Sequence, residues 1–400
     1  MNETGFGHRS AALAIAAAMQ DKYGTHCAVE IVNPFNDKRT PAILRNTQTG
    51  YDRAVQRPGL YRFAYRVSDM RLPNVAIESM LTIGLFQVIR DLIRCHQPHV
   101  IVTTHPHYLA PLDAAYAALG RHVPLITVVT DLTHVHHEWF HTVSDLLLVP
   151  TQAARRRAVQ HGLLLRRVKI TGIPVHPRLW QEQRPPAAIR AELGWQPDLP
   201  TVLVAGSKRM PHLADILHSL DDSSLIQQLV VVTGGDDALY RHLRQVKWRP
   251  ITHLYNFVDN MPSLMRAADC IICKAGGLIV SEALACGLPI LLVDVIEGQE
   301  TGNANFVVSG GAGALARSSS EVIDILQGWF GQAGQLLAQH AQSARRLGRP
   351  QAAHEVAELV WTEAGRNPNR ITENKYPLRF INLLDRLRMP RQEKRLRGSL

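Results

Sequence analysis

The sequence lacks any long uninterrupted apolar run. Its nearest approach to one, LIVSEALACGLPILLVDV (278–295), is interrupted by Ser281, Glu282, Gly287 and Pro289, whereas a helix that crosses a bilayer needs about 20 consecutive apolar residues. The first residues, MNETGFGHRS, also lack the charged region and following apolar stretch of a secretory signal. We therefore expect a cytoplasmic protein that meets a membrane only peripherally, on its cytoplasmic face.

Cysteine is scarce as well. The five cysteines are an odd number scattered through apolar segments, which argues against a disulfide framework and for a reducing compartment. Cys270 and Cys273 form a C-x-x-C pattern, but Ile271 and Ile272 between them favour a buried strand. No second pair completes a zinc site, so we expect no metal here.

The positive charge is unevenly distributed. The net charge is +10, and residues 366–400 carry ten Lys or Arg against three acidic residues. Such a tail suits nucleic acid, an anionic membrane surface or solubility alone. Since no nucleic-acid-binding module accompanies it, the sequence favours the membrane over nucleic acid.

Short apolar, β-branched runs alternate with helical stretches, which is typical of parallel α/β architecture. In the first half, the predicted strands are 26–32, 99–104, 124–130, 145–150 and 167–172, and the predicted helices are 8–24, 79–96 and 113–119. In the second half, the predicted strands are 201–206, 229–234, 251–257, 270–276 and 289–295, and the predicted helices are 211–220, 236–245, 261–267, 278–286, 301–310 and 320–345. The chain therefore reads as two Rossmann-like domains facing a cleft.

The Pro-rich, polar stretch 179–200 separates the two series and reads as a linker. We predict an N-terminal domain over 1–178, a C-terminal domain over 201–365 and a basic helix and tail over 366–400. The turn GFGH (5–8) follows only MNET, although a doubly wound domain needs a first strand before such a turn. The first strand of the N-terminal domain is thus expected to be missing.

The turn Gly5-Phe6-Gly7-His8 is the first candidate site. Glycines at a strand–helix junction let the backbone approach a ligand, and the following helix N-terminus carries free N–H groups. A histidine side chain has a near-neutral pKa, so His8 is suited to act as a general base. The alternative is a structural histidine at a common type of turn.

A denser pattern occupies 255–313. Phe257 and Val258 end a predicted strand and could contact a flat base. Gly276 and Gly277 open a helix whose first amides could hold a diphosphate, and Glu282 could accept hydrogen bonds from ribose hydroxyls. Three further polar residues could contact sugar hydroxyls: Gln299, Glu300 and Asn303.

These motifs resemble one enzyme family. The stretches YNFVDNM, KAGGLIVSEAL, GLP and GQE resemble the donor-binding region of the family that contains monogalactosyldiacylglycerol synthases, processive diacylglycerol glucosyltransferases and, more remotely, MurG. GFGHRSAALAI, the block TDLTHVHHEWFHTVSDLLLVPT (130–151) and ITGIPVHPRLW (170–180) resemble its other motifs. The resemblance covers about residues 5–315, with Phe6, Ala275 and Ile279 departing from the family's usual Gly, Pro and Thr.

The resemblance implies a GT-B fold and an inverting, metal-independent transfer of galactose or glucose from UDP-galactose or UDP-glucose to diacylglycerol or a related lipid, with no cofactor. It makes His8 the general base. The donor would be held by Gly206, Ser207, Phe257, Val258, Gly276, Gly277, Leu278, Glu282, Gln299, Glu300 and Asn303, and the acceptor side would include Gly5, Gly7, Asp131, His136 and Trp139.

Alternatives remain open at this point. The acceptor could be a lipid-linked peptidoglycan precursor, or the chain could be an inactive, N-terminally truncated nucleotide-sugar-binding homologue. Asp131 could orient a loop or act as a second base. Basic and aromatic residues interleave in 53–94, and Phe380, Ile381, Leu384 and Leu387 share one helical face. Either segment suits a membrane interface, although the second could equally pack on the protein.

Overall fold

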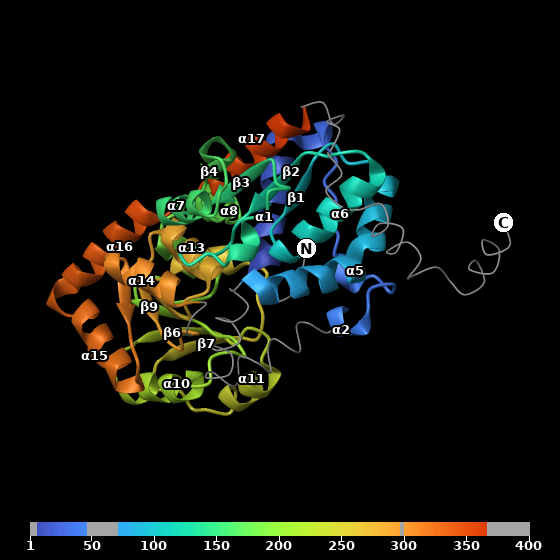
Figure 1. The fold of residues 1–400 in the computed structure, drawn as a ribbon. Coiled ribbons are helices and arrows are strands. Elements are labelled where there is room, and N and C mark those ends of the chain that lie inside the picture. Colours follow the sequence, from blue (N-terminus) through green and yellow to red (C-terminus); the bar gives the residue numbers. More distant parts are fainter. Residues whose placement is uncertain (1–5, 46–70, 297–299, 366–400) are drawn as a thin grey trace, which may run out of the picture.

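The computed structural model describes residues 6–45, 71–296 and 300–365. Its first domain is built on a parallel sheet in the order β1-β2-β3-β4 (Figure 1). The strands are β1 (Ile101–Thr103), β2 (Leu125–Val128), β3 (Leu146–Val149) and β4 (Val168–Ile170). Every residue of β2 and β3 is buried, as expected for parallel strands covered by helices on both faces.

Helices pack on both faces of this sheet. On one face, α5 (Arg71–His96) and α6 (Leu109–Leu119) lie against each other and bury a cluster that includes Tyr116 and Leu125. On the other face, α1 (Phe6–Tyr23) contributes Ala14 and Ile15 to a cluster with β2 and β3. The remaining helical elements are α2 (Ala42–Arg45), α7 (Gln152–Gln160) and the 3-10 turns η1 (Gly24–His26), η2 (Pro34–Asn36), η3 (Pro106–Tyr108), η4 (His137–Trp139) and η5 (Leu165–Arg167).

The strand predicted over 26–32 is wrong. Residues 27–32 form no regular secondary structure and join neither sheet, and Val29 is 44% exposed. Alternating β-branched residues form a strand only where a neighbouring strand supplies partners for the backbone. Within the described residues, no strand is paired with this segment.

The second domain is a six-stranded parallel sheet in the order β10-β9-β8-β5-β6-β7. Its strands are β5 (Thr201–Ala205), β6 (Gln228–Val232), β7 (Ile251–Tyr255), β8 (Cys270–Cys273), β9 (Ile290–Leu292) and β10 (Gly313–Leu315). Its helices are α10 (Leu213–Asp222), α11 (Asp237–Leu243), α12 (Met261–Ala267), α13 (Gly277–Cys286), α14 (Thr301–Ser309), α15 (Ser319–Phe330) and α16 (Gln335–Leu347), with η6 (Gln332–Gly334) between the last two. The predicted pair of Rossmann-like domains is confirmed.

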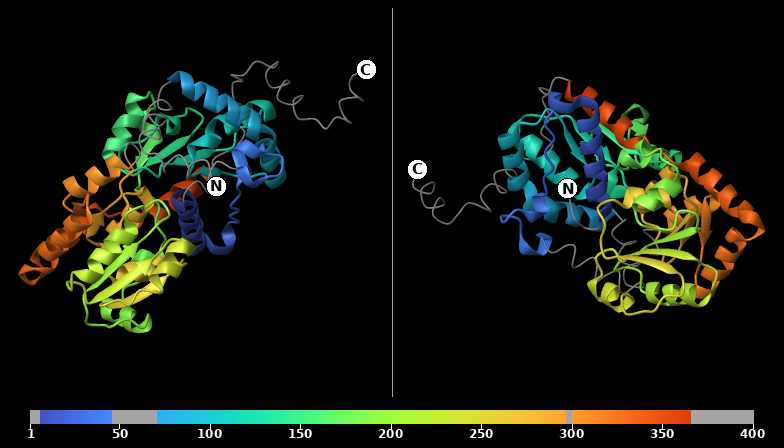
Figure 2. Two further views of the ribbon diagram at one scale, coloured as in Figure 1. Left: turned by 90° about the horizontal axis from the view of Figure 1, so that it is seen from below. Right: turned by 180° about the vertical axis from the view of Figure 1, so that it is seen from behind.

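The single helix predicted over 320–345 is two helices. The chain turns at η6, where Ala333 and Gly334 adopt left-handed backbone angles (φ 55° and 74°). The sequence pattern also missed α17 (Ala352–Ala364), which returns to the first domain and packs on α1, although it falls within 201–365 (Figure 2). There Tyr23 stacks on Trp361 with ring centroids 4.2 Å apart.

The predicted linker is ordered and packs on the second domain. It contains α8 (Arg178–Gln181) and α9 (Pro186–Glu192). The buried Arg190 donates to Ala267 O (2.6 Å) and pairs with Asp269 (2.7 Å). Of the helices that the structure describes, none is both long and apolar enough to span a membrane. The tail, residues 53–70 and residues 71–76 (apart from their backbone) lie outside this description.

Candidate active site between the two domains

The two domains meet at glycines that carry no side chain to keep them apart. A Cβ on Gly277, at the start of α13, would collide with Thr130 O, and one on Gly302, in α14, would collide with Thr133 and His134. Asn303 is buried and bridges the domains, because its Oδ1 accepts from Leu132 N (3.1 Å) and its Nδ2 donates to Ala275 O (3.0 Å). The loop after β2 is therefore held against the first turns of α13 and α14.

His8 lies beside this seam, in the first turn of α1. Its Nδ1 is 2.6 Å from Thr104 O and 3.0 Å from Thr130 Oγ1. A carbonyl can only accept, so we assign the Nδ1 proton to the bond with Thr104. Nε2 is then the basic atom, and no described residue bonds to it. Burial lowers the pKa of His8 to about 4, so the imidazole is neutral at physiological pH.

A chain of imidazoles extends from His8. Its ring centroid is 4.4 Å from that of His105, which is 4.5 Å from that of His107. His107 Nε2 lies 3.4 Å from a carboxylate oxygen of Glu138. Burial lowers the pKa of His105 well below its usual value. Sequence reasoning missed His105, His107 and Glu138; polar residues directly after the strand at 101–103 were the available signal.

Of the predicted acceptor-side residues, Trp139 lies near His8 and contacts Asp131. Asp131 follows β2 and accepts a hydrogen bond from Trp139 Nε1 (3.1 Å); burial raises the pKa of this carboxyl to about 6. Trp139 is buried, with its ring centroid 6.1 Å from that of His8. His136 caps η4 by accepting from Glu138 N (3.4 Å). The bond to Trp139 gives Asp131 an orienting contact.

The N-terminus of α13 faces the N-terminus of α1. The two helices are in contact, and a Cβ on Gly7 would lie 3.8 Å from Leu278 Cβ. Gly276 precedes α13 with no side-chain cap, and the first intrahelical bond runs from Val280 N to Gly276 O. The amides of the first turn before Val280 therefore have no acceptor within the helix, an arrangement that suits an anion.

Glu282 lies one turn further along α13. No described residue donates a hydrogen bond to its carboxylate or forms an ion pair with it, and burial raises its pKa to about 8. A shielded carboxylate without a protein partner costs stability. A ligand with two neighbouring hydroxyl groups would offset that cost.

The loops after neighbouring strands complete this side of the site. Gly206 follows β5 and donates to Val232 O (2.7 Å), while a Cβ there would press on Leu213 and on that same carbonyl. Ser207 accepts from Arg209 N (3.3 Å) in the turn that follows. After β7, Phe257 is 55% exposed, whereas Val258 packs on the core. An exposed ring beside a partly buried apolar residue suits a planar base.

Two of the predicted sugar contacts, Asn303 and Glu300, have partners within the protein. Asn303 Oδ1 accepts from Leu132 of the first domain and its Nδ2 donates to Ala275 of its own domain, so both ends of its amide are engaged within the protein. Glu300 is 3% exposed; one oxygen pairs with Lys274 and the other accepts from Ile296 N (3.2 Å). Gln299 and Gly5 lie outside the described residues.

The C-x-x-C motif forms a buried strand, as predicted, because Cys270 and Cys273 are fully buried in β8. Burial raises the pKa of the Cys273 thiol to about 12, which makes it unreactive at neutral pH. Among the residues that the structure describes, no three His, Cys, Asp or Glu side chains are grouped so as to hold a metal ion.

Comparison with known proteins decides the family. Residues 8–175 match the model of monogalactosyldiacylglycerol (MGDG) synthase, and residues 201–329 match the glycosyltransferase family 28 C-terminal domain. MGDG synthase 1 of Arabidopsis thaliana is 31% identical over 90% of this chain and 70% of its own length. The chain belongs to the MGDG synthase family. It is a hexosyltransferase that transfers a sugar to a lipid.

Other relatives agree with this assignment. The MGDG synthase of Spinacia oleracea is 31% identical over 90% of this chain and 72% of its own length. The structure of Acinetobacter baumannii MurG covers 89% of this chain with a TM-score of 0.53 and 17% identity, and the chain covers 96% of MurG. A Neisseria meningitidis UDP-GlcNAc 2-epimerase has the same TM-score at 14% identity, with 71% of this chain and 82% of its own covered. The structural likenesses show the GT-B fold alone, and the family comes from the sequence matches.

The raised pKa of Glu282 predicts a pH-dependent cost to stability in this family member. In the unfolded chain the carboxyl loses its proton near its ordinary value of 4.5, but in the fold it keeps the proton until about pH 8. Stability is therefore lost as pH rises from about 4.5 to 8. Glu282→Gln should raise the free energy of unfolding by about 1–3 kcal/mol at pH 8.5 and by little at pH 4.5.

Urea denaturation of both proteins at the two pH values measures this difference. Asp324→Asn, at an exposed position of α15, is the matched control and should change stability by less than about 0.5 kcal/mol. A Glu282→Gln protein that is less stable than the wild type at pH 8.5 would show that the carboxylate has a stabilising partner.

Proposed function

We propose that the protein transfers galactose or glucose from a UDP-sugar to diacylglycerol or a related membrane lipid, with inversion and without a metal. The observation that carries the proposal is the position of His8. Its Nδ1 is fixed by Thr104 and Thr130, and Thr130 O contacts the first turn of α13. A base thus lies next to a helix N-terminus suited to a diphosphate.

The arrangement supports a single in-line displacement. An acceptor hydroxyl beside His8 gives its proton to Nε2 as its oxygen attacks the anomeric carbon of the donor. The bond from that carbon to the β-phosphate oxygen breaks, and the electron pair leaves with UDP. Attack from the face opposite the leaving group inverts the anomeric centre. The low pKa of His8 keeps Nε2 unprotonated before the reaction.

The donor fits the second domain. Glu282 is the only side chain of α13 that offers a shielded carboxylate within the described helix, and a ribose supplies two neighbouring hydroxyls to it. The amides at Gly277 and Leu278 suit the diphosphate, and the exposed Phe257 ring suits the uracil. Helix amides stabilise the leaving diphosphate without a metal.

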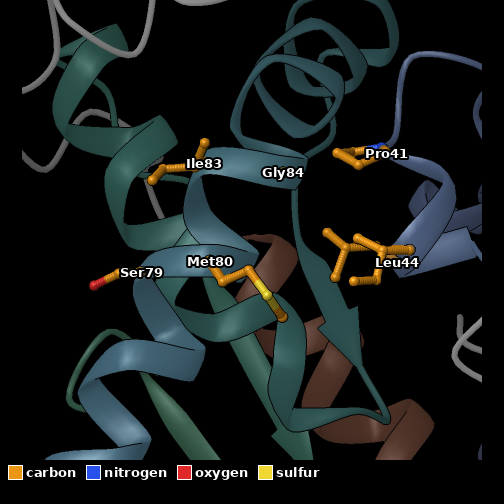
Figure 3. A pocket seen from close by; sticks show the side chains of 7 residues that line it. Pro41, Leu44, Ser79, Met80, Ile83 and Gly84 are labelled. Atoms are coloured by element: carbon orange, nitrogen blue, oxygen red, sulfur yellow. The ribbon is translucent and has the colours of Figure 1, made fainter. Parts of the chain in front are cut away.

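The acceptor fits the first domain. A shallow apolar groove of about 470 Å³ lies between α2 and α5 and is lined by Pro41, Ile43, Leu44, Ser79, Met80, Ile83 and Gly84. Figure 3 shows Pro41 and Leu44 facing the turns of α5 that carry Met80 and Gly84. A Cβ on Gly84 would collide with Leu44 Cδ1, so this glycine sets the spacing of the two helices. An acyl chain is the occupant that such a surface fits.

The part of α5 that lines the groove also lies near His107. Glu78 and Leu81 line a small cavity with His107 and Glu138, so the groove and the histidine chain lie on neighbouring faces of one helix. Ile43 is 72% exposed at the groove, and Lys38 and Arg45 are exposed nearby along the chain. Apolar side chains with flanking cations suit the interface of an anionic membrane. A lipid bound there places its polar end toward His8.

Sugar transfer tests the proposal directly. Purified protein is incubated with EDTA, diacylglycerol in anionic liposomes and radiolabelled UDP-galactose or UDP-glucose, and the anomeric configuration of the product is read by NMR. We expect a β-linked glycolipid from one of these α-linked donors. His8→Ala should lower kcat by a factor of about 10²–10⁴, and Glu282→Ala should mainly raise KM for the donor. His26→Ala, at an exposed position in η1, is the control.

Three results would contradict parts of this proposal. Transfer that EDTA abolishes requires a metal, and an α-linked product requires retention. Binding of UDP without transfer to diacylglycerol points to another acceptor, such as a lipid-linked peptidoglycan precursor.

The groove predicts a separate effect on the acceptor. Ile83→Asp replaces an exposed apolar side chain of the groove with a charged one, next to the exposed Met80. It should lower liposome binding and raise KM for diacylglycerol at least fivefold, with UDP affinity unchanged. Leu165→Asp, at a 61% exposed position in η5 of the same domain, is the control. Equal effects of the two substitutions in a liposome-flotation assay would rule out a specific role for the groove.

A further inference from the structure

Lys274 lies at the centre of the donor side, although the sequence motifs did not single it out. It directly follows β8, and its side chain is 19% exposed. Its Nζ forms an ion pair with Glu300, whose side chain is 5% exposed. A Cβ on Gly276 would lie 3.0 Å from that Nζ. The ammonium group is therefore next to the N-terminus of α13.

The charged ammonium group of Lys274 is electrostatically unfavourable at the N-terminus of α13. The N-terminus of a helix has a partial positive charge that disfavours Lys, and the first turn of α13 contains no acidic residue. A buried ion pair rarely adds stability over apolar residues of similar size. Since stability does not account for Lys274, an anion that contacts both the ammonium and the helix amides is the simplest reason for it.

We propose that Lys274 binds the diphosphate of the donor and stabilises UDP as it leaves, and that Glu300 positions Lys274. The inference rests on the function proposed above. When the acceptor oxygen bonds to the anomeric carbon, its proton moves to His8 and the bond from that carbon to the phosphate oxygen breaks. The electron pair remains on that oxygen, where Lys274 offsets the added charge while keeping its own proton.

Glu300 is a positioning residue because its oxygens are engaged inside the protein. One pairs with Lys274, and the other accepts from Ile296 N (3.2 Å). It also precedes α14, and its own N–H donates to Ile296 O (2.9 Å). These bonds hold the Glu300 carboxylate against the ammonium group of Lys274. Glu300 would therefore act on the donor only through the position of Lys274.

Calorimetric titration with UDP and with UMP, both in EDTA, separates the phosphate contact from the rest of the nucleotide. Lys274→Met should weaken UDP binding at least tenfold and change UMP binding by less than about threefold, and it should lower kcat by about 10²–10³. Lys274→Arg should recover part of both losses. Lys247→Met, at an exposed position of the same domain, should change neither. The double variant K274M/E300Q leaves no unpaired buried charge, so it keeps the test valid if Lys274→Met alone does not fold.

Glu300→Gln distinguishes positioning from sugar contact. If Glu300 positions Lys274, the substitution lowers kcat and weakens UDP and UDP-sugar binding by the same factor. If it weakens only UDP-sugar binding, Glu300 contacts the sugar and its positioning role is overturned. Wild-type affinity for UDP in both Lys274→Met and the double variant, with kcat unchanged, would overturn the role of Lys274. Failure of the wild type to bind UDP would instead overturn the proposed donor, and this inference with it.

Discussion

The contact between the loop after β2 and the first turns of α13 and α14 determines the geometry of the site. Gly277 and Gly302 have no side chain, so Thr130 O and Thr133 Oγ1 can approach them closely. Asn303 links the two domains because its Oδ1 accepts from Leu132 N while its Nδ2 donates to Ala275 O of its own domain. Thr130 is also a partner of His8. The same seam thus places His8 of one domain beside the N-terminus of α13 in the other. A larger side chain at either glycine would separate the two.

The proposed nucleotide would explain why three charged side chains, Glu282, Lys274 and Glu300, are shielded in the second domain. Glu282 has no described partner, and Lys274 and Glu300 form a shielded pair near a helix N-terminus. Each arrangement lowers the stability of the free protein relative to an apolar alternative. Under the proposed function, the hydroxyls and the negative charge of a nucleoside diphosphate would compensate both. Such compensation concentrates binding energy at the ribose and the diphosphate, where it is available for orienting the sugar and for stabilising the leaving group.

The sequence predicted the parallel α/β domains because β-branched runs and amphipathic helices alternate regularly, and the comparisons confirm the family that its motifs suggested. It did not predict the contacts that cross between distant segments. The strand expected at 26–32 depended on a partner strand that its own pattern does not reveal, and α17 joins the first domain through packing on α1. His8 and Glu282 stood out because motif and chemistry coincide there. His105 and Glu138 did not, because only the fold brings them to the site. Lys274 is part of the KAGGLIVSEAL motif, but neither its pairing with Glu300 nor the contact of Asn303 with Leu132 has a local signal.

The central claim is that one nucleotide site lies at the N-terminus of α13, facing His8 across the domain seam. A crystal structure of the protein with bound UDP tests it most directly. The account predicts the ribose hydroxyls on Glu282 and the diphosphate within hydrogen-bond distance of the amides of Gly277 and Leu278, with the terminal phosphate directed toward His8. UDP bound with its ribose away from Glu282, or with its diphosphate outside the first turn of α13, would contradict it.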